Sequence, residues 1–157
     1  MTAQLILTTA RAKGVMLATA ESCTAGMIAA ALTDLAGSSS IFDRGFVTYT
    51  NAAKMQMLDV QAATLKAHGA VSEQVAAQMA QGALAHSDAD IAVAVTGIAG
   101  PGGSDHKPEG RVCFGLAQTN QTTFVETVEF GALGRANVRQ ATTTHALNLV
   151  LTALNRD

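Results

Sequence analysis

Ser22 stands where a predicted buried strand runs directly into a predicted helix, in the segment Leu17-Ala-Thr-Ala-Glu-Ser-Cys-Thr-Ala-Gly26. A hydroxyl at a helix start can attack a carbonyl group while free backbone N–H groups of the next residues, Cys23 and Thr24, hold the developing oxyanion. The same position suits a simple N-cap by Ser22 or Thr24. Cys23 is a rival nucleophile or a small core residue. The segment indicates a nucleophile or a capped helix, and it lacks the G-x-S-x-G pattern of a nucleophile elbow.

Tyr49 and Lys54 lie at a second strand-to-helix junction, Phe46-Val-Thr-Tyr-Thr-Asn-Ala-Ala-Lys54. Asn51 is a good N-cap and would place Lys54 in the first helical turn, where the helix dipole disfavours an ammonium group. The dipole is worth about 0.3–1 kcal/mol and one pKa unit about 1.36 kcal/mol, so desolvation must do most to make this amine a general base near neutrality. We expect Lys54 to be buried against the strand that ends at Tyr49. Taken singly, a solvated lysine and an edge-of-core tyrosine also fit.

A glycine-rich segment follows the end of another buried strand, and it reads Val95-Thr-Gly-Ile-Ala-Gly-Pro-Gly-Gly-Ser-Asp-His-Lys-Pro-Glu-Gly110. Open α/β sheets bind ligands at this end of their strands, and glycines such as Gly97 and Gly100 let backbone amides approach an anion. The segment matches neither G-x-G-x-x-G nor G-x-x-x-x-G-K-[ST], which disfavours a bound dinucleotide or ATPase activity. Because long loops in compact domains are usually functional, we predict a binding loop rather than a plain connection.

No metal or cofactor is expected. The four histidines show no H-x-x-x-H or H-E-x-x-H pairing, and the acidic and histidine residues Asp105, His106 and Glu109 are more simply solvated loop residues than metal ligands. The spacing leaves a Ser/His/Asp triad open, because triads assemble in space. Cys23 and Cys113 have no metal-ligand spacing and do not suggest a disulfide framework, so we expect both thiols to be reduced.

The composition fits one globular domain over residues 1–157, because 48% of the residues are apolar and a chain of this length can bury a full core. The formal net charge is −2 and no basic block occurs, which argues against nucleic acid or an anionic membrane as partner. No apolar stretch is long enough to span a membrane and the first residues lack signal-peptide features, so the cytoplasm is the expected location. The sequence leaves the oligomeric state open, a homo-oligomer included.

Ala-rich segments at helical spacing alternate with short β-branched or aromatic runs, which is typical of an α/β sandwich. The strands on either side of Thr119–Gln121 are too close in sequence for a crossover and should form an antiparallel hairpin, so we expect a mixed, mainly parallel sheet. The expected elements are helix 3–13, strand 15–20, helix 23–35, strand 41–49, helix 52–58, helix 61–68, helix 73–86, strand 90–96, strand 111–118, strand 122–130 and helix 135–154.

Five ordered blocks carry a resemblance to a known family, and they are Ala20-Glu-Ser-Cys-Thr-Ala-Gly26, Leu35-Ala-Gly-Ser-Ser39, Arg44-Gly-Phe-Val-Thr-Tyr-Thr-Asn-Ala-Ala-Lys54, Gly69-Ala-Val-Ser72 and Thr96-Gly-Ile-Ala-Gly-Pro-Gly-Gly103. Together they closely resemble the CinA C-terminal domain family, the nicotinamide-nucleotide amidohydrolases, in its stand-alone form. The resemblance runs from about Leu17 to the last helix. It implies a three-layer α/β/α sandwich that hydrolyses the carboxamide of nicotinamide mononucleotide (NMN) to nicotinic acid mononucleotide and ammonia, in pyridine-nucleotide salvage.

The resemblance also implies site residues. The family's catalytic serine, tyrosine and lysine fall on Ser22, Tyr49 and Lys54, with the phenol relaying or orienting a proton between the other two. The substrate-binding positions that it implies, the two arginines being suited to phosphate, are Cys23, Thr24, Ser39, Gly97, Gly100, Arg135 and Arg139.

Two stretches depart from the family pattern. Lys107-Pro-Glu-Gly-Arg111 has Glu109 and Arg111 where the commoner pattern has an apolar and a small polar residue, which changes the charge near the pocket, and Gly134-Arg-Ala-Asn-Val-Arg139 follows the pattern loosely. Two other functions stay open, a non-catalytic nucleotide-binding regulatory domain and an amidase for a different small amide. Ammonia release from NMN would separate them from the first.

Overall fold

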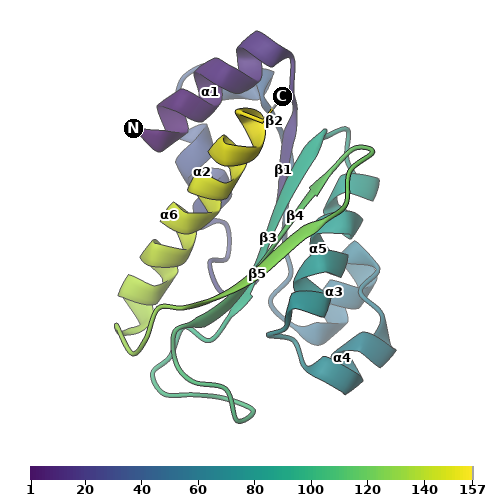
Figure 1. Cartoon of the computed structure of the whole chain (residues 1–157), viewed down its shortest axis with the longest axis vertical. Coiled ribbons are helices and arrows are strands. Elements are labelled where there is room, and N and C mark those ends of the chain that lie inside the picture. Colours follow the sequence, from purple (N-terminus) through teal and green to yellow (C-terminus); the bar gives the residue numbers. More distant parts are fainter. Residues whose placement is uncertain (157) are drawn as a thin grey trace.

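A five-stranded sheet lies at the centre of the computed structural model, which describes residues 1–156 (Figure 1). Its strands are β1 (Leu17–Glu21), β2 (Phe42–Val47), β3 (Ile91–Gly97), β4 (Arg111–Gln118) and β5 (Phe124–Glu129), in the order β2-β1-β3-β4-β5. β1 pairs in parallel with both β2 and β3, whereas β4 is antiparallel to β3 and to β5. Because β2, β1 and β3 are parallel neighbours, their carboxyl ends meet at one edge of the sheet.

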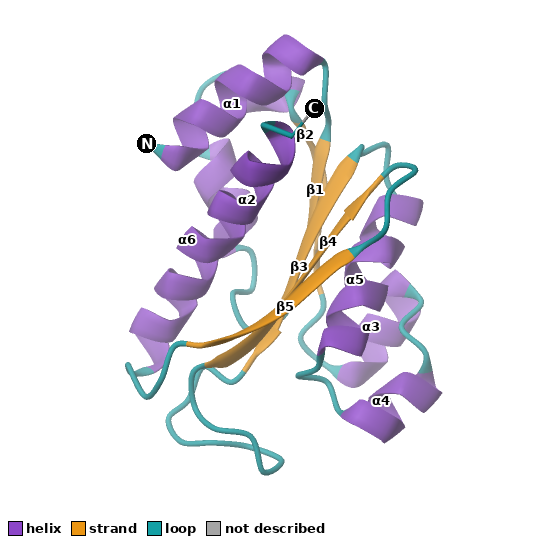
Figure 2. Ribbon diagram, in the orientation of Figure 1, coloured by secondary structure: helices purple, strands orange, loops and turns teal. Residues whose placement is uncertain are grey.

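Helices cover both faces of the sheet (Figure 2). One layer consists of α1 (Thr2–Lys13), α2 (Met27–Thr33) and α6 (Arg135–Leu154), and the other of α3 (Asn51–Leu58), α4 (Ala62–His68) and α5 (Glu73–Ala85). A short 3₁₀ turn, η1 (Ser38–Ser40), follows α2. The expected three-layer α/β/α sandwich with a mixed, mainly parallel sheet is confirmed.

Side-chain size decides how closely each helix layer approaches the sheet. On β1, Leu17 faces the core under α1 and α6, whereas Ala18 and Ala20 face the core under α5, as the alternation of a strand requires. α5 lies so near the sheet that a Cβ at Gly115 would clash with the backbone carbonyl of Ala76. The close packing of α5 on the sheet therefore requires small residues on this face. The Ser22 side chain, which contacts Lys54 of α3, lies on the same side of the sheet.

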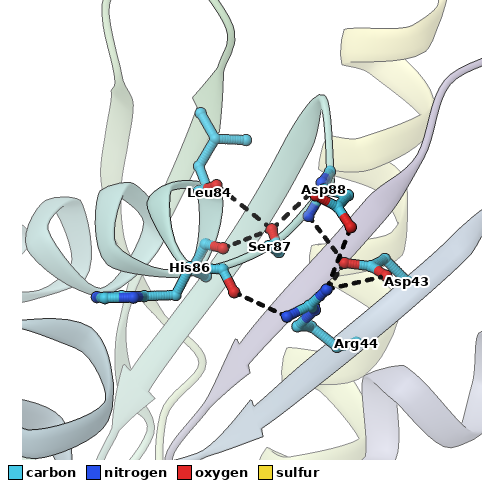
Figure 3. A network of polar contacts seen from close by, with 8 residues as sticks. Asp43, Arg44, Leu84, His86, Ser87 and Asp88 are labelled. Atoms are coloured by element: carbon cyan, nitrogen blue, oxygen red, sulfur yellow. Dashed lines mark hydrogen bonds and ion pairs between the residues drawn. The ribbon is translucent and has the colours of Figure 1, made fainter.

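Edge strand β2 is held by a polar network at its amino end (Figure 3). Asp43 pairs with Arg44 (2.7 Å) and accepts from the Asp88 N–H (2.9 Å), and Arg44 also donates to the carbonyl of His86 (3.2 Å). The guanidinium of Arg44 lowers the pKa of Asp43. These bonds tie β2 to the turn between α5 and β3, at the opposite end of the sheet from the site described below.

The expected elements are all present, and one differs in a way that matters for function. The helix expected over 23–35 begins only at Met27, because Ala25 and Gly26 adopt positive φ values of 47° and 100°, which a helix cannot contain. Ser22 therefore lies in a turn between β1 and α2, not at the helix start. The prediction of helix 23–35 is wrong in its first turn.

No helix within residues 1–156 combines the length and the apolar character needed to cross a membrane.

Candidate active site

The Ser22 turn is fixed from both sides. The Ser22 N–H continues the pairing of β1 by donating to the Val95 carbonyl (3.1 Å), and the Ala25 N–H donates back to the Ser22 carbonyl (3.1 Å). The hydroxyl of Ser22 is buried next to the carboxyl end of β3. A hydroxyl held in this way needs no rearrangement of the backbone to meet a substrate.

Glu21 caps the helix whose N-terminus the sequence had assigned to the oxyanion. Its side chain is 1% exposed and accepts from the Ile28 N–H (2.9 Å), the Ala29 N–H (3.1 Å) and the Thr24 hydroxyl (2.6 Å). A carboxylate at this place satisfies the free N–H groups of a helix start and suits the helix dipole. The start of α2 is thus occupied, and an oxyanion must be held by other groups.

The backbone of the Ser22 turn offers those groups. Within residues 1–156, the N–H groups of Cys23 and Thr24 donate no hydrogen bond to any other residue. They belong to the two residues directly after Ser22, and an oxyanion site needs donors close to the attacked carbonyl group. The oxyanion role of the Cys23 and Thr24 backbone stays a prediction, now without the helix that was expected to orient these groups.

Lys54 lies under this turn, in the first part of α3. The N-cap of α3 is Thr50, whose hydroxyl accepts from the Ala53 N–H (3.0 Å), so the expected cap Asn51 is instead the first helical residue. Lys54 is 1% exposed, which confirms its predicted burial. Its Nζ lies 2.9 Å from the Ser22 Oγ and donates to the Thr48 carbonyl at 2.9 Å.

Burial favours the neutral form of this amine. Desolvation lowers the pKa of Lys54 from 10.5 to about 8, against a smaller opposing effect of Cys23. At neutral pH a fraction of about one tenth of the amine is then unprotonated. In that form Nζ still donates to the Thr48 carbonyl and turns a lone pair to Ser22, whose hydroxyl becomes the donor of their shared hydrogen bond.

The neighbouring thiol is a poor competitor. Cys23 is buried, and desolvation raises its pKa to about 11. The thiolate is the reactive form of cysteine, and a thiol with such a pKa stays protonated near neutrality. Ser22 is the better placed nucleophile of the two.

A cavity of about 340 Å³ opens over Ser22 and Lys54, within the range of small-molecule sites. The glycine-rich loop forms one wall, and both Gly97 and Gly100 line it. A Cβ at Gly97 would come within 2.7 Å of the Val112 side chain, so only glycine permits this close packing of β3 on β4. The predicted binding loop does border the candidate site.

Tyr49 and Arg135 stand together at the cavity. The Tyr49 ring is 57% exposed, and its hydroxyl accepts from the Arg135 guanidinium (2.7 Å), which also donates to the Gly100 carbonyl (2.7 Å). Within residues 1–156, the Tyr49 hydroxyl has no hydrogen bond to Ser22 or Lys54. The phenol is therefore not the link between these two residues, which contact each other directly.

Three of the substrate-binding residues implied by the resemblance, Thr24, Ser39 and Arg139, do not line the cavity, and Thr24 is fully buried with its hydroxyl bonded to Glu21. Arg139 donates to the carbonyls of Cys23 (2.9 Å) and Thr24 (3.3 Å), so it supports the Ser22 turn from behind. Ser39 is exposed in η1, where the chain has returned along α2 to the amino ends of the strands. The phosphate role expected for Arg139 and the substrate role expected for Ser39 are not supported by these positions.

Residues 1–156 contain no cluster of three or more His, Cys, Asp or Glu side chains placed to hold a metal ion.

Two groups that contribute to the candidate site were absent from the sequence-based prediction, the Glu21 carboxylate and the Thr48 carbonyl. The role of Glu21 was predictable from the sequence, because an acidic residue that ends a buried strand needs hydrogen-bond partners and the N–H groups of the next helix are the nearest. The role of the Thr48 backbone carbonyl was not predictable, because every residue carries such a group.

Comparison with known proteins places these features in a family. Residues 1–154 match the CinA C-terminal domain. The chain is 49% identical over 138 residues to "Nicotinamide-nucleotide amidohydrolase PncC" of Escherichia coli K12, covering 87% of this chain and 83% of that protein. It is 60% identical over 108 residues to the protein of the same name from Enterobacter agglomerans, covering 68% of this chain and 66% of the other.

Other curated relatives are longer, and the chain spans about a third of their length. Among solved structures, it is similar to the competence/damage inducible protein CihA from Agrobacterium tumefaciens. The TM-score is 0.94 at 52% identity, over 99% of this chain and 94% of the other.

Proposed function

The chain belongs to the CinA C-terminal domain family, and we propose that it hydrolyses the carboxamide of NMN to nicotinic acid mononucleotide and ammonia. The observation that carries the proposal is the 2.9 Å contact between the Ser22 hydroxyl and the buried amine of Lys54. Relatives named for amidohydrolysis of a nicotinamide nucleotide supply the substrate. The geometry supplies a nucleophile and a base.

Ser22 attacks the carboxamide carbon in this mechanism. Lys54 takes the proton of the Ser22 hydroxyl as the C–O bond forms, which requires the neutral amine that burial favours. The carbonyl oxygen becomes an oxyanion, and the N–H groups of Cys23 and Thr24 stabilise it. No metal is needed, because the activation and the charge stabilisation both come from the chain.

Departure of ammonia returns the proton. The Lys54 ammonium protonates the amide nitrogen as the C–N bond breaks, which leaves an ester on Ser22. Water then attacks the ester, Lys54 accepts the water proton, and the Ser22 oxygen leaves as a hydroxyl after taking that proton. The sum is one amide and one water converted to one acid and one ammonia.

Arg135 and the glycine loop are the proposed holders of the nucleotide part. The cavity lining contains two basic side chains, Lys54 and Arg135. Lys54 is bonded to Ser22, so Arg135 is the one available for the nucleotide part, and its guanidinium suits a phosphate. Tyr49, in contact with Arg135 and largely exposed, offers an aromatic face and a hydroxyl to the ribose or the pyridine ring. Tyr49 is then a binding residue rather than a proton relay.

Ammonia release from NMN by the purified chain tests the proposal. The native chain should release ammonia and nicotinic acid mononucleotide, Ser22→Ala should abolish release while still binding NMN, and Cys23→Ala should be far milder. Release only from another nicotinamide derivative would make the chain an amidase for a different amide. NMN binding without release from any of these amides would make it a nucleotide-binding module.

A further inference from the structure

Glu109 joins two segments that border the cavity. It lies half-buried near the end of the glycine-rich loop, and its two carboxylate oxygens accept from two different backbone groups, the Gly102 N–H (2.7 Å) and the Gly134 N–H (3.0 Å). Gly102 belongs to the loop itself, and Gly134 is the residue before α6. Both partners are donors, so the bridge requires a group that only accepts.

The bridge lies directly behind the contacts of Arg135. Arg135 follows Gly134 as the first residue of α6, and its guanidinium donates to the Gly100 carbonyl and to the Tyr49 hydroxyl. The Glu109 side chain packs against the Gly100 backbone, where a Cβ would come within 2.6 Å of the carboxyl carbon. Glu109 thus holds both ends of the Arg135 contact, the helix start that carries the arginine and the loop that accepts from it.

We propose that Glu109 is a positioning residue, which fixes Arg135 and through it the phenol of Tyr49 at the mouth of the cavity. Without the carboxylate bridge, the Arg135 bond to Gly100 is the one hydrogen bond among residues 1–156 that joins α6 to loop residues 98–109, while the Phe130 N–H still donates to the Gly110 carbonyl (2.8 Å) next to Glu109. The guanidinium then loses its fixed distance to Gly100, and Tyr49 loses its partner for part of the time. The Ser22–Lys54 pair should keep its geometry, because its hydrogen bonds to Val95, Ala25 and Thr48 involve neither Glu109 nor Arg135.

Glutamine at position 109 is the sharpest perturbation. It has the shape of glutamate, but its amide nitrogen is a donor and would face one of the two N–H groups. One bond of the bridge is lost and one N–H is left opposed by another. Glu129→Gln is the matched control, since Glu129 is a half-exposed carboxylate of β5 that pairs with Arg111 outside the cavity.

Tyr49 itself reports the effect. It is the one tyrosine of the chain, so tyrosine labelled with ¹³C at the ring carbon Cζ alone gives a single labelled signal by NMR. Glu109→Gln should shift this signal although residue 109 does not touch the ring, and Glu129→Gln should leave it unchanged. In an Arg135→Ala background, Glu109→Gln should produce no further shift, because the path runs through the arginine.

Two results would overturn the assignment. One is a Tyr49 signal that stays in its native position in folded Glu109→Gln. The other is an equal shift with and without Arg135, which would mean a general loosening of the loop. Glu109→Asp, whose shorter carboxylate cannot reach both amides, should repeat the Glu109→Gln result, and it serves if the glutamine variant does not fold.

Substrate affinity provides a second measurement, which rests on the proposed function. Glu109→Gln should raise KM for NMN about tenfold, the usual scale for losing one hydrogen bond to a charged group, with kcat and its pH profile within about twofold of native. A fall in kcat with unchanged KM would contradict a role through Arg135. If the native chain released no ammonia, the proposed function would fail, whereas the Tyr49 signal would still decide the role of Glu109.

Discussion

Replacing Lys54 by methionine should abolish turnover and also change how stability depends on pH. Burial lowers the pKa of Lys54 from 10.5 to about 8, so the folded chain holds this proton less tightly than the unfolded chain does. Folding is then penalised wherever the unfolded chain keeps the proton. The penalty is absent well above pH 10.5, grows as the pH falls toward 8 and is complete below pH 8.

The size of the effect follows from the two pKa values. One pKa unit is about 1.36 kcal/mol, so the shift from 10.5 to about 8 costs the native chain about 3 kcal/mol at pH 7 and about 1 kcal/mol at pH 10. Methionine carries no proton and fills a similar elongated space. The unfolding free energy of Lys54→Met minus that of the native chain should therefore fall by about 2 kcal/mol between pH 7 and pH 10. Loss of the bonds to Ser22 and Thr48 alters both values alike and cancels.

Urea unfolding of both proteins at the two pH values measures this difference. Lys66→Met, which removes an exposed lysine of α4, is the matched control for the loss of a positive charge. Parallel stability curves for Lys54→Met and the native chain from pH 7 to pH 10 would refute the reasoning. They would mean that Lys54 keeps an ordinary proton affinity in the folded chain and is no general base.

Three further predictions concern activity. The kcat/KM of the native chain for NMN should rise about tenfold per pH unit below pH 8 and level off above it, while Lys54→Arg, whose guanidinium keeps its proton, should be nearly inactive at every pH in the same assay; an unchanged profile in Lys54→Arg would remove the base. Glu21→Gln should lower the unfolding free energy by about 1–3 kcal/mol, because an amide cannot accept both α2 N–H groups, and should lower kcat as the Ser22 turn loosens; urea unfolding and ammonia release check both, and a native kcat would show that the turn does not need its cap. Activity should survive exhaustive chelation, and loss that one divalent metal restores would move the chemistry to a metal-bound water.

The position of the site could be predicted from the sequence because it depends on strand ends. Ser22, Tyr49 and Gly97 each lie at or just after the end of a strand of strong pattern, and the carboxyl ends of parallel neighbours must meet. The burial of Lys54 followed from the size of the required pKa shift. These inferences use only local pattern and the general geometry of α/β sheets.

The finer parts of the site depend on contacts between distant segments, which no local pattern describes. Arg139 was expected at the phosphate because it is basic, but its place on α6 directs it to the carbonyls of the Ser22 turn, 116 positions away from Cys23 in the chain. Ser39 stands in a motif with Gly37, yet α2 carries it to the far end of the sheet. The helix start at Met27 depends on the positive φ values of Ala25 and Gly26, which the Ala-rich helical pattern on both sides of Gly26 does not reveal.

Mass analysis of the chain during turnover tests the Ser22 mechanism most directly. Acid quenching of the native chain with saturating NMN, followed by peptide mapping, should show a fraction of the peptide containing Ser22 heavier by nicotinic acid mononucleotide less one water. Ser22→Ala should show no adduct and no ammonia release. An adduct that persists in Ser22→Ala and disappears in Cys23→Ala, or ammonia release by Ser22→Ala at the native rate, would contradict a serine nucleophile activated by Lys54.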